Sequence, residues 1–595
     1  MGGFVLLHTD PGKDCSATQA AALGAFAGMG IGAPRLVHGE GYVLAMFPKR
    51  QESEPELEQF ANGDFVFCCG TLIYDDKVGR AAAAAFYRDY HGPPGPRDRA
   101  LGHYAVILRK GATTDLVSDG FGGFHVFRDD QGRMASSSFL AVAATLDRLT
   151  LSTQGASEYV FNGVVSGDAT LFNEIGLLPV GASLAVRERG LEIRRHPLQI
   201  STSVSTEPFA ASISHSMELL DRCFGAVAKN FGDRVSCALS GGYDSRLILA
   251  LLRRHGVRPR LYVYGPRGDK DIGIARAIAE GERFALEIVD KDDQPALSPD
   301  EFAEVAHANF LDSDGYGWSG IFTNGAERVQ RARRVAGNAI ALNGGGGEIW
   351  RNFFYLLDRS YSPRQLLWSF YSQFDPRICT SVFDEEAYFR GLEDKLAVLV
   401  GDVRRLLPRP LVEWLYHNFR CRAWDGRINV INNTYGYAAL PFLERPLTEH
   451  ASAIPIGWKN HGAYEAELIR RADRRLAEYP SGYGHDFSGA PPLTRRLVDY
   501  GTYLRPPWLR RFVYRVKHRT RSSIEWPDYL RKEYRDAALP GGVQQMSALF
   551  QLQRVADPAQ MARIWSLEYL IRQFGRSVRI GFAQPAKRKS RKCAA

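Results

Sequence analysis

Cysteine is scarce in this sequence, and the cysteines present are not spaced as ligands. Eight of the 595 residues are cysteines, and only Cys68 and Cys69 are adjacent. No Cys-x-x-Cys or Cys/His ligand spacing occurs, which argues against a disulfide framework and against a zinc ribbon. There is also no run of 18 apolar residues and no basic-then-apolar leader, so we expect neither a membrane span nor secretion. These absences predict a protein of the reducing cytoplasm.

The composition is otherwise that of an ordinary globular chain. Hydrophobic residues make up 45% and charged residues 24% of a length sufficient for two or three domains. The formal net charge of +9 is partly due to a basic run from Lys587 to Lys592. Such a run is typical of a solvated tail, so we assign residues 581–595 to a basic disordered tail. Because no RNA- or DNA-binding motif accompanies it, we predict no nucleic-acid partner.

The most informative stretch lies between Val235 and Leu252. An apolar run predicts a buried strand, a glycine turn follows, and a helical pattern begins directly after the turn. Glycines let the backbone approach an anion closely, and a helix N-terminus offers free N–H groups to phosphate. The predicted nucleotide-binding residues of this first loop are Ser240, Gly241, Gly242, Asp244 and Ser245.

An ordinary turn between a strand and a helix is the alternative for this loop, and a bare Gly-Gly is usually no more than that. Ser-Gly-Gly-x-Asp-Ser after a β-branched strand is more specific. The Walker pattern is excluded, because it requires a lysine and none follows here. Asp244 would repel a phosphate directly, so its predicted role is to hold a bridging Mg²⁺.

A second glycine loop follows the apolar run from Ala339 to Leu342. It begins at Asn343, continues through four glycines from Gly344, and ends at Glu348. As in the first loop, an apolar strand leads into a glycine turn that could bind an anion, and this turn also contains one carboxylate. The alternative is a plain flexible loop.

Together the two loops resemble those of the N-type ATP pyrophosphatases, and specifically the asparagine synthetase family. Enzymes of this family cleave ATP to AMP and pyrophosphate while they activate a carboxylate. The resemblance implies ATP and Mg²⁺ as cofactors, with Asp244 and Glu348 as the metal ligands. It also implies that Asn343 and Gly344 belong to the pyrophosphate-binding loop.

From about residue 206 onwards, helices alternate with apolar strands, which predicts a doubly wound parallel sheet. The run from Leu261 to Gly265 is the strand expected beside the first loop, with its end at the nucleotide. In the family, backbone at this point contacts adenine, so Val263 and Gly265 are candidate adenine contacts.

Residues 1–205 show many short strands, and their order resembles the N-terminal glutaminase domain of glutamine-dependent asparagine synthetases. The resemblance implies an Ntn-type αββα sandwich. The chemistry of that domain is missing. Such a glutaminase uses an N-terminal cysteine with its own amine as base, whereas Gly2 stands here and Thr71 replaces the family's glutamate. We therefore predict an inactive scaffold domain.

The segment from 206 to 580 is predicted to be the ATP-pyrophosphatase domain, with an Arg-rich helical extension from about residue 494. Its closing motifs resemble the family only in part. Tyr437 stands where the family has a catalytic glutamate, and no lysine occurs in the glycine-containing loop near Gly482. In the family that lysine stabilises the transition state and the adenylate. Lys459, Arg495 or Arg496 would have to supply the charge.

The predicted reaction is adenylation of a carboxylate by MgATP, followed by attack of an amine to form an amide. Without a glutaminase, the nitrogen must come from ammonia or from an amine carried by the substrate. The second case resembles the β-lactam synthetases and lasso-peptide cyclases, which close rings, so a precursor peptide is among the candidate carboxylate substrates. The alternatives are an ammonia-dependent asparagine synthetase and a catalytically inactive binding module.

Overall fold

A computed structural model describes residues 2–581, except residues 11, 13, 199, 201, 267, 294–295, 402–404, 519–525 and 576–577. The basic tail predicted for residues 581–595 lies outside the described residues from 582 onwards. Within the described ranges, no helix is both long and apolar enough to cross a bilayer.

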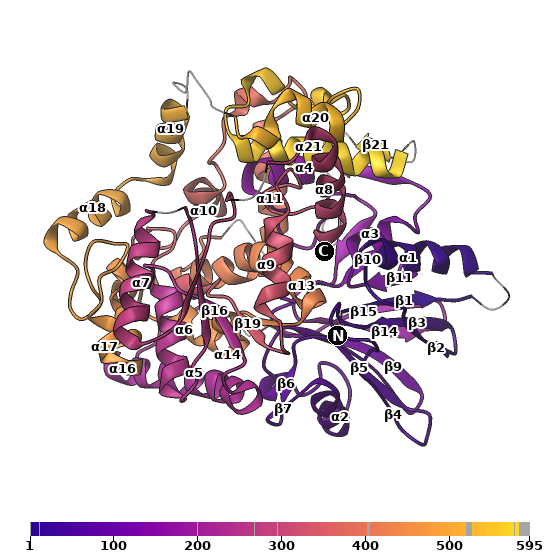
Figure 1. Cartoon of the computed structure of the whole chain (residues 1–595), viewed down its shortest axis with the longest axis horizontal. Helices are drawn as coiled ribbons and strands as arrows, with labels where there is room; N and C mark the ends of the chain where they lie inside the picture. The colour runs from indigo at the N-terminus through magenta and orange to yellow at the C-terminus, as the bar shows by residue number, and fades with distance from the viewer. Residues whose placement is uncertain are drawn as a thin grey trace, which may run out of the picture.

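Two six-stranded antiparallel sheets form the N-terminal part of the chain, drawn in indigo and purple in Figure 1. In spatial order the first sheet consists of β13 (Ile175–Leu177), β10 (Phe127–Asp129), β11 (Met134–Ser136), β1 (Gly3–His8), β3 (Tyr42–Phe47) and β2 (Arg35–Gly39). The second consists of β15 (Gly190–Arg195), β14 (Ala182–Arg187), β9 (Thr113–Ser118), β8 (Tyr104–Lys110), β5 (Phe65–Gly70) and β4 (Leu57–Gln59).

The alternation of side chains along β1 shows how these sheets are layered. Phe4 and Leu6 pack in one cluster with residues of the second sheet, so they lie between the sheets. Val5 and Leu7 point the other way, into a cluster that contains residues of α1 (Ser16–Gly28) and α3 (Phe139–Ala143). The second sheet is covered by α2 (Gly79–Asp89), which packs on β5. The predicted αββα sandwich is confirmed.

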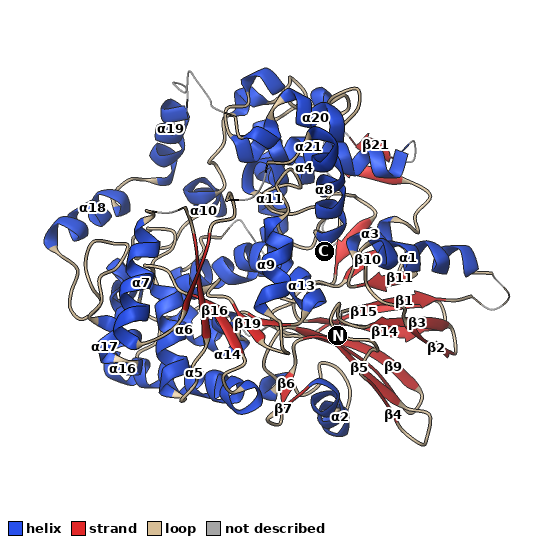
Figure 2. Cartoon of the chain, in the orientation of Figure 1, coloured by secondary structure: helices blue, strands red, loops and turns tan. Residues whose placement is uncertain are grey.

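The second part of the chain contains a five-stranded parallel sheet. Its strand order is β18 (Leu286–Val289), β17 (Arg260–Tyr264), β16 (Val235–Ala238), β19 (Ile340–Leu342) and β20 (Tyr437–Ala439). The first helices of this part are α5 (Phe209–Phe231), α6 (Tyr243–Arg254) and α7 (Lys270–Glu282). Helix α6 packs on β16 and α7 packs on β17 and β18, and Figure 2 shows helices flanking the strands. The doubly wound sheet is therefore confirmed.

The other helices of this part surround the sheet and carry several of the site residues. They are α8 (Pro299–Asp312), α9 (Ala326–Arg334), α10 (Pro363–Phe370), α11 (Glu385–Val400), α12 (Arg409–Leu415), α13 (Arg422–Tyr435), α14 (Arg445–Ala453), α15 (Ile456–Lys459), α16 (Ala463–Ala472) and α17 (Arg474–Ala477).

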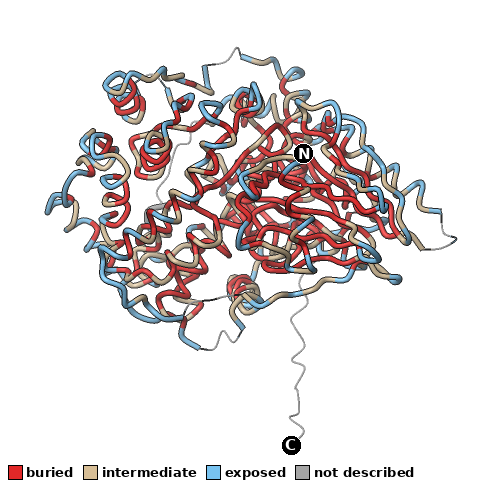
Figure 3. The backbone as a smooth tube through the Cα atoms, turned by 90° about the horizontal axis from the view of Figure 1, so that it is seen from below, coloured by how far each residue is buried: buried red, intermediate tan, exposed pale blue. Residues whose placement is uncertain are grey.

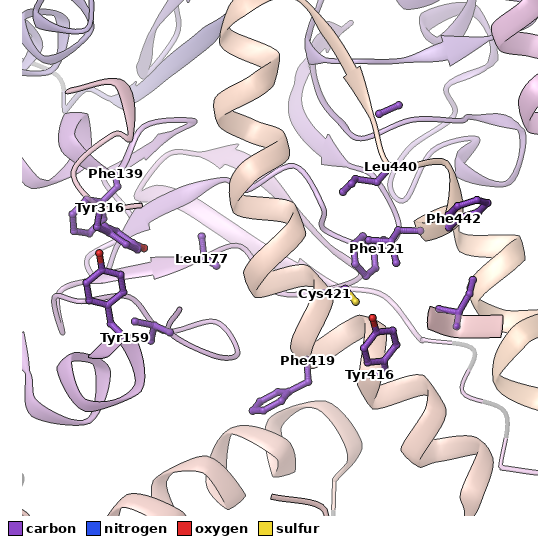
Figure 4. Close-up of a cluster of buried hydrophobic side chains, with 14 of the residues drawn as sticks. Phe121, Phe139, Tyr159, Leu177, Tyr316, Tyr416, Phe419, Cys421, Leu440 and Phe442 are labelled. Carbon is purple, nitrogen blue, oxygen red and sulfur yellow. The ribbon is translucent and has the colours of Figure 1, made fainter. Parts of the chain in front are cut away.

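The two parts share one hydrophobic core. In Figure 4, Phe121 of the N-terminal part lies near Leu440 and Phe442 of the second part. The rings of Phe139 and Tyr316 meet edge to face with centroids 5.1 Å apart. Buried polar groups also join the parts, as Asp314 accepts from the Ser138 hydroxyl at 2.6 Å. In Figure 3 the buried segments, drawn in red, lie together in the interior, and exposed segments lie mostly at the periphery. The sandwich is thus part of the body of the protein and not an appendage.

The C-terminal extension is mostly helical, as predicted, with α18 (Leu493–Tyr503), α19 (Pro507–His518), α20 (Lys532–Ala538) and α21 (Pro558–Phe574). It is not simply a solvated cap, because Ile564, Leu567 and Leu570 of α21 are fully buried. After α21, β21 (Val578–Gly581) pairs in parallel with β12 (Leu149–Ser152) of the N-terminal part. The end of the segment assigned to the second domain therefore returns to the first.

Candidate functional site

The first glycine loop connects β16 to α6 at the carboxyl edge of the parallel sheet. The backbone N–H of Ser240 donates to Oγ of Ser245 at 3.0 Å, and that of Gly242 donates to Oγ of Ser240 at 3.2 Å. Gly241 donates to Asp271 at 3.1 Å, and a Cβ atom at Gly241 would lie 2.7 Å from the same carboxylate oxygen. The loop is thus held by its own serines, and its glycine is required by the close contact with α7.

The second glycine loop follows β19 and lies against the first. Its backbone is anchored by Asn343, whose N–H donates to Ala439 O at 3.1 Å and whose Oδ1 accepts from Gly345 at 2.9 Å. A Cβ atom at Gly347 would lie 2.0 Å from Oδ1 of Asp244. Only glycine can occupy this position without moving the carboxylate, so the loop sequence is explained by its contact with the start of α6.

Arg351 lies between the two carboxylates that the sequence predicts as metal ligands. Its Nη2 atom donates to both oxygens of Asp244 at 2.8 Å and lies 3.7 Å from Oε1 of Glu348. Its Nε atom lies 2.9 Å from Oε2 of Glu465, which is fully buried on α16. One guanidinium therefore balances three carboxylates at the point where the two loops meet.

Burial raises the pKa of three carboxyl groups in this region. It raises the pKa of Asp244 against the opposing effect of Arg351. It raises the pKa of Glu465 well above its usual value, helped by the negative charge of Asp244. It also raises the pKa of Asp425, on α13, to about 7. The guanidinium of Arg351 opposes this effect at both Asp244 and Glu465, because a nearby positive charge favours the ionised carboxylate.

Glu348 is oriented by an irregular helical segment. A π-helical turn, Tyr416–Cys421, separates α12 from α13, and the hydroxyl of Tyr416 donates to Oε2 of Glu348 at 2.7 Å. Turns of this type occur frequently at functional sites, because the extra residue redirects side chains. Here the turn directs Tyr416 at the carboxylate.

A small cleft of about 60 Å³ opens beside the cluster. It is lined by Tyr243, Arg351, Asn352, Tyr355, Lys459, His461, Gly462, Tyr483, His485, Arg495, Asp499 and Tyr503. The Lys459 ammonium is fully buried and lies 2.9 Å from Oε2 of Glu413. Burial lowers the pKa of Lys459, and Glu413 opposes this effect. Arg495 pairs with Asp499 at 3.3 Å and lies over the ring of Tyr483.

The structure brings most of the predicted site residues together. The first glycine loop, Ser240 to Ser245, meets the second loop at the carboxyl edge of the sheet. The predicted residues of the second loop are Asn343, Gly344 and Glu348. Lys459 and Arg495 line the adjoining cleft, whereas Arg496 is not among its lining residues. Val263 and Gly265 stand at the end of β17, the strand next to β16, and Val263 is 2% exposed.

Tyr437 does not lie where the resemblance puts a catalytic group. It begins β20 and pairs with Ile340, the first residue of β19, so it lies at the amino edge of the parallel sheet. Its ring packs under Nζ of Lys49 at 3.5 Å and against Phe231. Because parallel strands place all their carboxyl ends at one edge, a residue that starts a strand faces away from both glycine loops.

Sequence reasoning missed Arg351, Glu465 and Asp425. Glu465 had a detectable signal, since it shares the buried face of α16 with Leu468 and Ile469, where a carboxylate requires a partner. Arg351 and Asp425 had no comparable signal. Arg351 follows Glu348 by only three residues, so its place at the second loop is local, but its contacts with Asp244 and Glu465 and the position of Asp425 depend on the tertiary structure.

The N-terminal part has structural roles at its diverged positions. The hydroxyl of Thr71 donates to Oδ1 of Asn433 at 2.8 Å and accepts from the N–H of Ala438 at 3.0 Å, both in the second part. A Cβ atom at Gly2 would lie 2.1 Å from Pro48 O. Position 2 therefore has no room for a cysteine side chain in this backbone, and Thr71 joins the two parts of the chain.

Comparisons with known proteins give little beyond this geometry. No protein-family model matches the chain, and no curated protein matches it. One similar solved structure is glutamine phosphoribosylpyrophosphate amidotransferase from B. subtilis complexed with ADP and GMP, at 10% identity and a TM-score of 0.24. The match covers 48% of this chain and 65% of that one, which is less than two thirds of its length.

A second similar structure is described as the allosteric regulatory enzyme of purine biosynthesis, at 10% identity and a TM-score of 0.21. It covers 49% of this chain and 74% of that one. TM-scores this low support no conclusion about the fold or function of this chain. The fold assignment accordingly depends on the sheets and layers described above.

Proposed function

We propose that this protein is an ATP-dependent ligase that adenylates a carboxylate, releases pyrophosphate, and joins the activated carboxylate to an amine. The observation that carries the proposal is the meeting of two glycine loops and two carboxylate side chains at the carboxyl edge of a parallel sheet. Ligands of doubly wound proteins bind at this edge. The neighbouring cleft supplies cationic side chains.

The residues present fit MgATP. The first loop offers serine hydroxyls and the start of α6 to phosphate oxygens. Asp244 and Glu348 are oxygen donors of the kind that Mg²⁺ prefers, and the absence of a side chain at Gly347 keeps the loop within contact of Asp244. Bound Mg²⁺ would neutralise charge on the phosphates during adenylation.

We assign roles to two cationic side chains of the cleft, Arg495 and Lys459. Arg495 is partly exposed and stands at the cleft, so it can hold the developing negative charge at the α-phosphate. Lys459 is already paired with Glu413 and fully buried, so its proposed role is to fix the wall of the cleft. An amine carried by the substrate itself would give ring closure, as in lasso-peptide or β-lactam formation, and ammonia would give an asparagine-type product.

A binding module without chemistry is the second candidate. The observation in its favour is the pairing of Arg351 with both oxygens of Asp244, which places a fixed positive charge beside a predicted metal ligand. Such a protein would hold a nucleotide or peptide without cleaving ATP. Release of pyrophosphate separates the two candidates.

The first experiment measures ATP binding, because this measurement does not require the carboxylate substrate to be known. The parent should bind radiolabelled ATP in a Mg²⁺-dependent manner, and Asp244→Ala should lose this binding at least tenfold, about 1.4 kcal/mol. Glu348→Gln should shift the magnesium titration and slow pyrophosphate release by more than tenfold. Asp300→Asn, an exposed carboxylate on α8, is the matched control. Equal Mg²⁺-dependent ATP binding in the parent and Asp244→Ala would overturn the assignment of the site.

A further inference from the structure

We infer that Glu207, His215 and His450 form a binding site for one divalent transition-metal ion, such as Zn²⁺. Among the described residues, this is the only group of three potential ligands whose donor atoms all lie within 4.8 Å of one another. None of the three lines the cleft beside the glycine loops. The inference therefore stands independently of the proposed ligase activity.

The fold brings the three donors together from separate segments. The linker between the two parts is held against α14, because the N–H of Ser205 donates to Ala453 O at 2.8 Å. Glu207 follows two residues later, directly before α5. His215 lies on α5 and His450 on α14, and these two helices pack on each other.

Neighbouring groups hold the imidazole of His450 in a form suited to metal binding. Its Nε2 atom lies 3.3 Å from the backbone oxygen of Ser212 and 2.9 Å from Oγ of Ser216. A carbonyl oxygen can only accept, so Nε2 can bond to Ser212 only in the tautomer that carries the proton on Nε2, and in that tautomer Nδ1 keeps its lone pair. Metal-ligating histidines commonly use one nitrogen for the metal while the other donates to a carbonyl in this way.

The distances require only a small closure to reach ligand geometry. Nδ1 of His215 lies 3.9 Å from Oε1 of Glu207, and the two imidazole rings have centroids 4.3 Å apart. Donors about 2.0–2.2 Å from a zinc ion stand roughly 3.4 Å apart in a tetrahedron. The side chain of Glu207 is 44% exposed and that of His215 is 45% exposed, so both can rotate to close the gap.

The donor set determines which ion fits. Two imidazoles and one carboxylate favour Zn²⁺, Co²⁺ or Ni²⁺ over Mg²⁺ and Ca²⁺, which prefer all-oxygen sites. Three protein donors leave a position for water on the exposed side. Since the donors come from the linker, α5 and α14, a bound ion would clamp the linker to the second part of the chain.

The test uses the full chain without a histidine tag and titrates Zn²⁺ by calorimetry in excess Mg²⁺. The parent should bind one Zn²⁺ per chain and melt at a higher temperature when Zn²⁺ is present. His215→Ala and Glu207→Gln, chosen because both side chains are partly exposed, should each weaken binding roughly tenfold or more. His91→Ala and Glu218→Gln, an exposed histidine and an exposed carboxylate on α5, should bind as the parent does.

Two results would overturn the inference. One is the absence of a stoichiometric Zn²⁺ site in the parent. The other is unchanged affinity in both His215→Ala and Glu207→Gln. Mg²⁺-dependent ATP binding should be the same in these variants as in the parent, so failure of the metal site and failure of the proposed function can be told apart.

Discussion

Replacement of Arg351 by methionine tests whether this guanidinium occupies the position of a cation that the site otherwise requires. At an effective dielectric constant of about 20, Coulomb's law gives roughly 6 kcal/mol of attraction at 2.8 Å and between 4 and 5 kcal/mol at 3.7 Å. These are the distances from Nη2 to Asp244 and Glu348. The cost of burying the charges offsets much of this attraction.

The net effect of Arg351→Met is therefore the cost of leaving buried carboxylates unpaired, which is about 3–5 kcal/mol when one partner is removed. For a cooperative unit of 595 residues, that corresponds to a melting temperature about 2–4 °C lower. Because the variant leaves Asp244 and Glu348 without a counter-charge, Mg²⁺ should stabilise it more than it stabilises the parent. At a Mg²⁺ concentration 100 times the dissociation constant, the gain is about 2.7 kcal/mol.

The assay is thermal unfolding of the parent and the variant over a magnesium titration, without ATP. Arg254→Met is the matched control, because Arg254 pairs with Asp221 on the surface, where such pairs contribute less than about 1 kcal/mol. The reasoning fails if Arg351→Met melts within about 1 °C of the parent, or if Mg²⁺ raises both melting temperatures equally. A magnesium response that survives the added change Asp244→Asn would also refute it.

Three further predictions address the cleft, the second loop and the interface between the two parts. Arg495→Met should reduce pyrophosphate release about 100-fold with little change in ATP affinity. Arg496 is next to it on α18 but does not line the cleft, so Arg496→Met should release pyrophosphate at the parent's rate. Equal rates in both variants would remove Arg495 from the mechanism. Gly347→Ala places a methyl group against the carboxylate of Asp244 and should destabilise the protein by about 1–3 kcal/mol. Gly273→Ala on α7 is the control, because there is open space around Gly273. Urea unfolding measures the stability of both variants. Burial raises the pKa of Glu444 from 4.5 to about 7, so the stability contributed by its protonated form is full below about pH 4.5 and is lost as the pH rises through 7. Glu444→Gln cannot ionise and should therefore gain up to about 3 kcal/mol relative to the parent at pH 8; parallel melting profiles between pH 4 and pH 8 would contradict this.

The sequence by itself determined the layers of the fold and the first shell of the candidate site. The order of the short strands in residues 1–205 resembles a glutaminase domain, and this resemblance implies the αββα sandwich. Apolar strands separated by helices predict the parallel sheet. Ser240 to Ser245 and Asn343 to Glu348 are local patterns, since each loop follows directly on its strand. Parallel strands place such loops at one edge, so their meeting follows from the order of elements alone.

Only the tertiary structure decided which charges surround those loops. Arg351 and Glu465 are far apart in sequence, and the fold places Nε of Arg351 2.9 Å from Oε2 of Glu465 on α16. Tyr437 matched a family position in a linear alignment of motifs, yet its place at the start of β20 puts it at the opposite edge of the sheet. Similarly, Lys459 and Arg495 enter one cleft while Arg496 does not, because adjacent residues on a helix point about 100° apart. Local pattern specifies backbone and turn, whereas the partners of a buried charge depend on contacts between segments that no local pattern contains.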